Sequence, residues 1–243
     1  PSLPTQDGRE PFTLHYHALK GRPSSYWKSE EFRFYAGILA VFTVLLTVDN
    51  LVAGTFGAGE AVRHSVFQTV SITTTTGFTT SDFGAWSSSA QLTILFLMFI
   101  GGSAGSTGGS IKVLRVMVLL KQGAIEIRKL LHPRAVMPVR IDGRAVAPGL
   151  VINILGFMFL YLGLLIVSTL AMALMGLDLI TAFSSVAASI GNIGPGLGGV
   201  GPAAHYLHVP AGGKWLLAFC MLAGRLEIYT VLVLLTRDFW KKA

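Results

Sequence analysis

Long apolar runs alternate with shorter, semi-polar segments along this chain. Residues 34–48, with a weak extension to residue 56, residues 146–177 and residues 215–235 are predominantly apolar. A helix needs about 20 apolar residues to cross a bilayer, so we expect each of these runs to contain a membrane-spanning helix. Residues 60–74 and 178–190 are too short or too polar to span. We interpret both as re-entrant helices, which enter the membrane and turn back.

One further apolar run is interrupted by a segment rich in Gly, Ser and Thr. Apolar residues 92–100 and 111–120 flank it, and glycine would destabilise a helix there by about 1 kcal/mol at each position relative to alanine. The spacing Gly101-x-x-x-Gly105 also suits close helix packing. We favour a helix over residues 88–120 that is broken by a flexible loop, a candidate gate. This gate segment consists of Gly101, Gly102, Ser103, Ala104, Gly105, Ser106, Thr107, Gly108, Gly109 and Ser110.

The order of these elements indicates an internal duplication. A spanning helix, a short helix, a turn and a second spanning helix occur twice, over residues 34–120 and 146–243. We expect residues 1–33 to form a polar, cytoplasmic lead-in with a short amphipathic piece at 12–20. Two short patterns occur in both copies: Phe67-x-x-Val70 with Phe183-x-x-Val186, one residue out of step, and Phe96-x-Met98-x-x-Gly101 with Phe219-x-Met221-x-x-Gly224.

A turn of unusual composition follows each short helix. Backbone carbonyls at such a point can replace the water around a cation without adding fixed charge. Glycine permits the backbone angles that direct carbonyls to one axis, and threonine adds a hydroxyl acceptor. Either turn read alone could be an ordinary loop, but their shared position favours an ion path. The first turn begins at Thr73 and contributes Thr74, Thr75, Thr76 and Gly77; the second turn contributes Gly191, Asn192, Ile193 and Gly194.

An arginine lies inside the last apolar run. A charge there is rare and normally faces a cavity or a partner group. Arg225 could be a pore cation that opposes ion passage and holds the gate segment, or one member of a structural ion pair; these roles are compatible. Pairing with Glu227 explains it poorly, because residues two apart on a helix point in different directions. We expect Lys112 and Arg115 to end a helix at the cytoplasmic interface. His64, His205 and His208 are expected at the outer surface.

Composition and charge place these helices in a membrane. The chain is 52% hydrophobic and 13% charged, against about 25% charged in soluble domains. Its net charge of +7 comes from bases next to apolar runs, which fits membrane topology better than nucleic-acid binding. Six of these bases lie at residues 121–145, so we expect that loop and the C-terminal tail to be cytoplasmic. Residues 81–87 and 202–213 are then external. The single cysteine, Cys220, allows no disulfide within the chain.

Five motifs together are highly specific. They are F-Q-T-V-S-I-T-T-T-T-G-F-T-T at residues 67–80, G-G-S-A-G-S-T-G-G-S-I-K at 101–112, H-P-R-A-V-x-P-V at 132–139, G-N-I-G-P-G-L-G at 191–198 and M-L-A-G-R-L-E-I-Y-T at 221–230. With them the chain resembles the TrkH/KtrB/HKT superfamily of potassium transporters, closest to its bacterial TrkH branch. The resemblance covers nearly the whole chain after about residue 12.

The resemblance implies an all-α integral membrane protein of the bacterial inner membrane. Four fused M1–pore helix–M2 units would surround one pore, with this chain as the third and fourth. Gly77 and Gly194 would then be filter glycines, residues 101–110 the gating loop with a broken M2 helix, and Arg225 the pore arginine. Ser110 stands where the family often has a third consecutive glycine. The implied partners are the N-terminal half of the pore, a second copy in a homodimer, membrane lipid and a cytosolic nucleotide-binding ring protein of the TrkA type. K⁺ is the implied transported ion, without an organic cofactor.

Two other classes of protein were weighed. A Na⁺- or H⁺-coupled secondary transporter also uses broken helices, but it normally places ionisable groups at the midplane, and none lies beside the turns. An enzyme is disfavoured, because no nucleophile–base set or metal-ligand cluster is visible. The G-x-G-x-x-G pattern at residues 194–199 follows a helical run rather than a strand, and the segment 105–112 lacks the G-K-[ST] order of a phosphate loop. Passage of K⁺ alone or with Na⁺, and channel against coupled transport, stay open.

Overall fold

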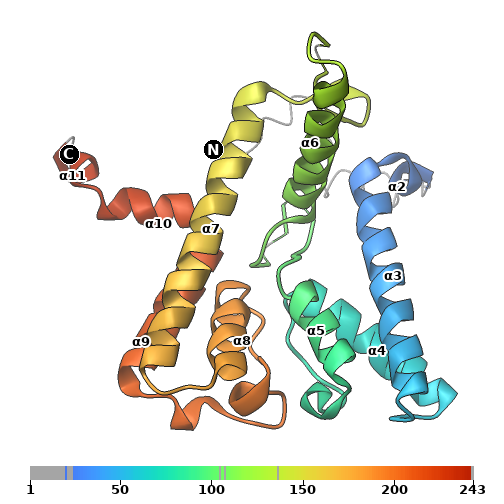
Figure 1. Cartoon of the computed structure of the whole chain (residues 1–243), viewed down its shortest axis with the longest axis vertical. Helices are drawn as coiled ribbons and strands as arrows, with labels where there is room; N and C mark the ends of the chain where they lie inside the picture. The colour runs from blue at the N-terminus through green and yellow to red at the C-terminus, as the bar shows by residue number, and fades with distance from the viewer. Residues whose placement is uncertain (1–19, 21–23, 104, 107, 136, 242–243) are drawn as a thin grey trace.

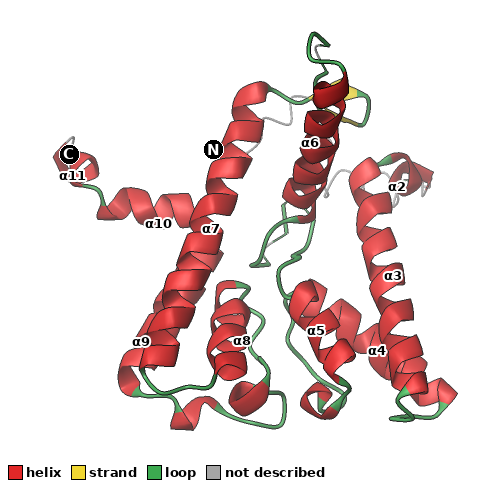
Figure 2. Cartoon of the chain, in the orientation of Figure 1, coloured by secondary structure: helices red, strands yellow, loops and turns green. Residues whose placement is uncertain are grey.

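The computed structural model describes residues 20, 24–103, 105–106, 108–135 and 137–241. Within these ranges the elements are helices, apart from one short hairpin (Figure 2). The predicted amphipathic piece at residues 12–20 lies outside the described residues except for Lys20, and so do Ala104 and Thr107 of the gate segment. The all-α class predicted from the sequence is confirmed.

Two long helices form the frame of the molecule (Figure 1). Helix α3, Glu30–Val52, follows the short helix α2, Ser24–Lys28, and its N-cap Ser29 accepts a hydrogen bond from the Phe32 amide. Helix α7, Pro148–Leu174, starts with proline, which has no amide hydrogen to leave unpaired in the first turn. Both helices are long and apolar enough to cross a membrane. The 27 residues of α7 extend over about 40 Å, which leaves length for tilt or overhang.

A short helix packs against each long one, as the sequence predicts. Helix α4, Ala58–Thr73, crosses the end of α3, and helix α8, Leu179–Ile190, lies beside α7 (Figure 1). The α8 N-cap, Asp178, accepts a hydrogen bond from the Thr181 amide, which satisfies one of the free donors at that helix end. Both short helices bury several hydroxyl-bearing residues.

The break in the apolar run over residues 92–120 is confirmed, and its second half extends further than expected. Helix α5, Ser88–Leu97, stops before the gate segment, and helix α6, Val113–Leu131, resumes after it. A single parallel bridge joins Ile100 to Ile111, so the chain enters and leaves the break side by side. The interpretation of residues 121–145 as a loop is wrong for its first part, which continues α6. Its last part is a hairpin of β1, Arg140–Ile141, and β2, Arg144–Ala145.

The apolar run at residues 215–235, predicted to contain a spanning helix, is divided between two helices. Helix α9, Ala211–Arg225, and helix α10, Ile228–Leu235, meet at a bend of 113°. Glu227 has a φ of 62°, a left-handed conformation that no helix interior contains. Helix α10 therefore extends away from the other helices and leads to α11, Arg237–Lys241 (Figure 1).

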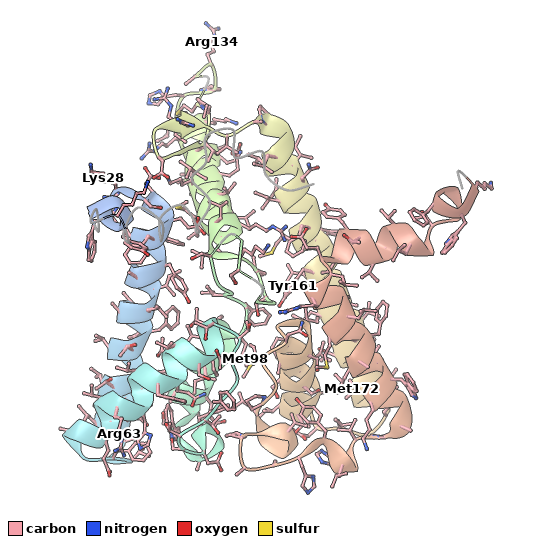
Figure 3. The ribbon with its side chains drawn as sticks, turned by 180° about the vertical axis from the view of Figure 1, so that it is seen from behind. Lys28, Arg63, Met98, Arg134, Tyr161 and Met172 are labelled. Atoms are coloured by element: carbon pink, nitrogen blue, oxygen red, sulfur yellow. The ribbon has the colours of Figure 1, made fainter. Side chains whose placement is uncertain are left out.

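Hydrophobic clusters hold the described helices together, and the two largest join them in two groups. One joins α7, α8 and α9, and includes Tyr161 and Met172. The other joins α3, α4 and α5, and includes Met98 (all three are labelled in Figure 3). Ala188 of α8 and Ile193 of the second turn belong to this second cluster, so the two groups of helices pack against each other at the turns. Many apolar side chains on the outer faces of α3 and α7 are exposed, which suits contact with lipid.

Candidate ion path

The first turn reverses the chain at the end of α4. The amides of Thr74, Thr75 and Thr76 donate to the carbonyls of Val70, Ile72 and Ser71, at 2.9, 3.0 and 2.9 Å. Thr75 has a φ of 57° and Gly77 a φ of 78°. A left-handed residue just past a helix end is the usual way to satisfy the last helical carbonyls.

The second turn has the same backbone hydrogen bonds. The amides of Gly191, Asn192 and Ile193 donate to the carbonyls of Ala187, Ser189 and Ala188, at 2.9, 3.0 and 2.9 Å. Asn192 and Gly194 have φ values of 54° and 111°, at the places of Thr75 and Gly77. This register pairs Val70 with Ala187. The match of Val70 with Val186 made from the sequence was therefore displaced by one residue. The internal duplication as a whole stays a prediction.

The two turns meet in space although 117 positions separate them in the register just described. A Cβ built on Gly77 would lie 1.8 Å from the carbonyl oxygen of Ile193 and 3.4 Å from Cδ of Pro195. The first distance is closer than non-bonded atoms approach, so no other amino acid fits at Gly77 unless the second turn moves. The structure therefore brings together the two turns that the sequence singled out.

The gate segment lies against both turns. A Cβ on Gly108 would lie 2.9 Å from Oγ1 of Thr75, and a Cβ on Gly109 would lie 2.2 Å from the carbonyl oxygen of Gly191. The segment also folds closely on itself, because a Cβ on Gly101 would lie 2.4 Å from the carbonyl oxygen of Gly109. Its glycines therefore permit close backbone approach to the turns, in addition to breaking the helix.

Ser110 ends the gate segment in a left-handed conformation. Its φ is 60°, and its Oγ donates a hydrogen bond of 2.7 Å to the carbonyl oxygen of Met98, the C-cap of α5. That bond offsets part of the steric cost of a side chain at positive φ. The same Oγ lies 2.5 Å from where a Cβ on Gly191 would be, so glycine is also required at the start of the second turn.

Arg225 is the last residue of α9 and lines a cavity below the second turn. The preceding glycine places it there: a Cβ on Gly224 would lie 1.8 Å from the carbonyl oxygen of Ile190, so α9 packs directly on the end of α8. The cavity has a volume of about 190 Å³ and is lined by Ser106, Gly108, Ser110, Lys112, Arg115, Phe157, Gly224, Arg225 and Glu227. The gate segment and the arginine thus share one space, whose lining carries more positive than negative charge.

Lys112 and Arg115 do not end a helix, contrary to the prediction. Lys112 is the N-cap of α6, and Arg115 lies in its first turn. A guanidinium nitrogen of Arg115 lies 2.8 Å from Oε1 of Glu227, and Nζ of Lys112 lies 3.7 Å from the same oxygen. Arg115 also stacks on the ring of Phe157, 4.1 Å from its centroid. These contacts join the far end of the gate segment to the bend between α9 and α10.

The histidines differ in their surroundings. His205 and His208 are exposed, as expected. His64 is buried, contrary to the prediction, and its Nδ1 lies 2.9 Å from Oγ1 of Thr80, which follows the first turn. Among the described residues, no group of three or more His, Cys, Asp or Glu side chains could hold a metal ion.

Residues 32–242 match the family described as TrkH: Cation transport protein. The chain belongs to this family. It is 42% identical over 238 residues to the Trk system potassium uptake protein TrkH of Vibrio parahaemolyticus, a match that covers 95% of this chain and 48% of that protein. The Escherichia coli K12 protein of the same name is 38% identical over 233 residues, with the same two coverages.

A solved structure supports the same family. The crystal structure of the potassium transporter TrkH from Vibrio parahaemolyticus aligns with a TM-score of 0.87 and 42% identity, over 94% of this chain and 49% of that one. The chain thus spans about half the length of the curated relatives that it matches. The TrkH family is one of transporters rather than enzymes, and this chain is an integral membrane protein of that family.

Two hydrogen bonds that hold the turns were not identified by the sequence analysis. Oγ of Ser71 donates a 2.6 Å hydrogen bond to the carbonyl oxygen of Phe78, just after the first turn. The hydroxyl of Tyr206, in the 3₁₀ helix η3 Tyr206–His208, donates a 2.7 Å hydrogen bond to the carbonyl oxygen of Gly194. Ser71 lies in the same motif as the threonines, which could have drawn attention to it. Tyr206 lies in an irregular loop, and no sequence pattern marks it.

Proposed function

We propose that this chain contributes two of the units of a pore for K⁺ uptake across the bacterial inner membrane. The observation that carries the proposal is a contact between the two turns, where Gly77 packs against Ile193. Both turns have left-handed residues at the same two positions. Potassium uptake by relatives at 42% and 38% identity supports the choice of ion. K⁺ is the transported substrate, and the proposal includes no organic cofactor.

In this proposal the backbone carbonyls of the two turns replace part of the water shell of K⁺. The left-handed residues turn successive peptide units, so that carbonyls at a helix end can face a common axis. Helix C-termini carry partial negative charge, which favours a cation there. The filter residues are Thr74, Thr75, Thr76 and Gly77 in the first turn, and Gly191, Asn192, Ile193 and Gly194 in the second.

The gate in this proposal is the gate segment together with Arg225. The segment passes directly against Thr75 and Gly191, where it would block the path below the turns. Arg225 lines the same cavity and would raise the energy of a cation at its level. Opening then requires the segment to move away from both turns.

Two turns cannot surround an ion path by themselves, so the complete pore needs further units. We propose that the N-terminal half of the same pore supplies two more turns, that the complete transporter forms a homodimer, and that a TrkA-like nucleotide-binding protein regulates it from the cytosol.

The distribution of basic residues supports an orientation in the membrane. Lys28 and Arg134 lie at one end of the molecule, the proposed cytoplasmic face, and Arg63 lies at the other (Figure 3).

A coupled secondary transporter is the second candidate. The two discontinuous spans, α5/α6 and α9/α10, are a feature that such transporters also use. The two candidates differ in their response to ion gradients. A channel-like pore conducts K⁺ down its electrochemical gradient alone, whereas a coupled transporter requires the Na⁺ or H⁺ gradient as well.

Uptake by the complete transporter tests the proposal. K⁺ and Na⁺ uptake would be measured in cells that depend on it for K⁺, with and without a proton gradient, for the wild type and Gly77→Ser. We expect K⁺-selective uptake in the wild type and weakened selectivity in the variant at equal membrane content. Unchanged selectivity in a correctly inserted variant would remove the filter assignment. Uptake that stops when the proton gradient is abolished at constant membrane potential would favour the coupled transporter.

Topology is tested separately by cysteine labelling in a Cys220→Ala background. Cysteines at positions 128 and 241 should react only from the cytoplasmic side. Cysteines at positions 82 and 207 should react from outside. Labelling of position 128 from outside would refute the proposed orientation.

A further inference from the structure

We propose that Tyr206 is a positioning residue of the ion path, whose hydroxyl fixes the carbonyl group of Gly194 and thereby maintains discrimination between K⁺ and Na⁺. This inference rests on the filter proposed above. It adds a residue that lies outside both turns, in the loop between α8 and α9.

The two filter glycines differ in what restrains them. Gly77 is packed against the second turn, because a Cβ there would lie 1.8 Å from the carbonyl oxygen of Ile193. A Cβ on Gly194 would meet no atom within 4 Å, although its φ is 111°. Packing against the second turn therefore limits the movement of Gly77, whereas no such contact lies beside Gly194. The 2.7 Å hydrogen bond from Tyr206 restrains the Gly194 carbonyl itself.

The chain on either side of Gly194 is anchored, which leaves this one carbonyl to be set. On one side the Ile193 amide donates to the Ala188 carbonyl at 2.9 Å. On the other, the Leu197 amide donates to Oγ of Ser184 and the Gly199 amide, in the 3₁₀ helix η2 Gly198–Val200, donates to Oγ1 of Thr181, both at 2.8 Å. The next residue is Pro195, whose ring fixes its own φ, so the Gly194 carbonyl is already restrained on that side and the Tyr206 hydrogen bond adds to this restraint at the oxygen itself.

Tyr206 is itself held firmly enough to act in this way. Its ring packs against the cluster formed by α7, α8 and α9. Nζ of Lys214, in the first turn of α9, donates a 3.1 Å hydrogen bond to the carbonyl oxygen of the next residue, Leu207. Val209, which follows η3, is 2% exposed within the same cluster. Burial raises the pKa of Tyr206 to about 12, so its hydroxyl keeps its proton and remains a donor at neutral pH.

The hydrogen bond has two consequences for a bound cation. It occupies one of the two lone pairs of the carbonyl oxygen and fixes the direction of the other. The first turn uses another device: Ser71 donates to the carbonyl of Phe78, and the residue in the place of Ser71 is Ala188, which has no hydroxyl. Phe78 corresponds to Pro195, so the bond that Tyr206 supplies from an outer loop holds the carbonyl one residue earlier in the second turn.

The variant Tyr206→Phe removes only the hydroxyl. In the complete transporter we expect the K⁺/Na⁺ flux ratio to fall about fivefold, the effect of losing one neutral hydrogen bond. Membrane content should be unchanged. The matched control is Tyr229→Phe, which removes a hydroxyl that donates at 3.1 Å to the carbonyl oxygen of Asn153, on α7 and away from both turns. Its ratio should stay at the wild-type value.

Other outcomes separate this inference from the proposed filter. A wild-type ratio in Tyr206→Phe, with a lowered ratio in Gly77→Ser, would overturn the role of Tyr206 and leave the filter standing. Unchanged ratios in both variants would overturn both. Reduced membrane content of Tyr206→Phe at an unchanged ratio would show a purely structural role and also overturn the inference.

Discussion

Thr75 and Asn192 occupy the same position in two turns that share three backbone hydrogen bonds, yet their surroundings differ. The first turn is held by its own helix: Oγ1 of Thr74 donates to the Val70 carbonyl at 2.7 Å, and Ser71 donates to Phe78. The second turn is held by distant parts of the chain. Nδ2 of Asn192 donates to the Met221 carbonyl of α9 at 3.1 Å, and Tyr206 donates to Gly194.

The two turns share one backbone geometry, but we expect the difference in their supporting contacts to give them separate roles in selectivity and opening. A turn whose hydrogen bonds run to its own helix should change shape less when neighbouring elements move, even though Gly108 of the gate segment lies against Thr75. A turn tied to α9, with Gly191 against Ser110 of the gate segment, responds to movement of either. The comparison therefore predicts that changes in the first turn alter ion selectivity, and that changes around the second turn alter opening as well.

The largest effect is expected from the two filter glycines. Gly77→Ser forces the second turn to move and should lower the K⁺/Na⁺ flux ratio by about tenfold or more, equivalent to about 1.4 kcal/mol. Gly194→Ser introduces strain at positive φ without a clash, so its effect should be smaller. Flux ratios of both variants in membranes with equal protein content would measure this. A larger effect at Gly194 would contradict the difference in packing between the turns.

The next largest effect should come from Arg225. Replacement by alanine removes a positive charge from the cavity below the second turn, so K⁺ flux should increase several-fold. Arg225→Lys keeps the charge but loses the planar group of donors. It should resemble the wild type if charge dominates, and alanine if hydrogen bonding dominates. Single-channel recording or flux normalised to folded protein would distinguish them. A stable alanine variant with wild-type flux would remove Arg225 from the mechanism.

Shortening the gate segment should raise basal flux. Deletion of Gly105 and Ser106 keeps the glycines that contact the turns, Gly108 and Gly109, but pulls them away from Thr75 and Gly191. We expect an increase of several-fold without a change in the K⁺/Na⁺ ratio. Flux measurements with a folding control, such as detergent-solubilised monodispersity, would check this. Loss of flux together with loss of the fold would favour a role in helix packing.

A smaller effect should separate the paired residues Thr75 and Asn192. Glycine accepts the left-handed conformation at both positions. Asn192→Gly also removes the link to α9, so it should change the fraction of time that the pore is open. Thr75→Gly removes the hydroxyl that lies against Gly108 but breaks no link to α9, so it should change opening less. Single-channel open probability of both variants would measure this, and equal changes would contradict the separate tasks of the two turns.

The smallest effect is expected at the bend of the last span. Glu227→Gln weakens the pairing with Arg115 and Lys112, which lies partly in solvent, and should lower stability by about 1 kcal/mol. Thermal unfolding in detergent would measure it. Glu126→Gln, which weakens the exposed pair with Lys129, is the matched control and should have almost no effect. Equal shifts in the two variants would contradict a specific role for the Glu227 pair.

The helices and the positions of both turns could be predicted from the sequence, because runs of apolar residues and clusters of glycine determine them over short stretches of chain. The bend at Glu227 could not. Glutamate is a good helix former, and the residues that follow are apolar, so local preference favours a continuous helix. The left-handed conformation of Glu227 accompanies an ion pair to Arg115, 112 positions away in sequence. Contacts at that distance leave no mark in local patterns.

The candidate site also has parts that the local sequence predicts and parts that it does not. Gly77 and Gly194 were recognisable from composition, and their pairing has the register of the hydrogen bonds, whereas the pairing of the apolar residues before them is one residue out of step. Phe183-x-x-Val186 matched Phe67-x-x-Val70 in sequence, but hydrogen bonding pairs Val70 with Ala187. Apolar residues on a buried short helix are interchangeable between adjacent positions, so they specify register weakly. The hydroxyl of Tyr206 reaches Gly194 from an irregular loop, a contact that only the folded chain brings about.

The central claim is that the two turns lie on one ion path. Anomalous diffraction from crystals of the complete transporter grown in Rb⁺, a K⁺ substitute with a strong anomalous signal, would test it most directly. We predict an Rb⁺ peak near the carbonyls of Thr75 to Gly77 and Asn192 to Gly194, and a weaker peak or none there in Gly77→Ser. A peak elsewhere in the membrane region, with none beside either turn, would contradict the account.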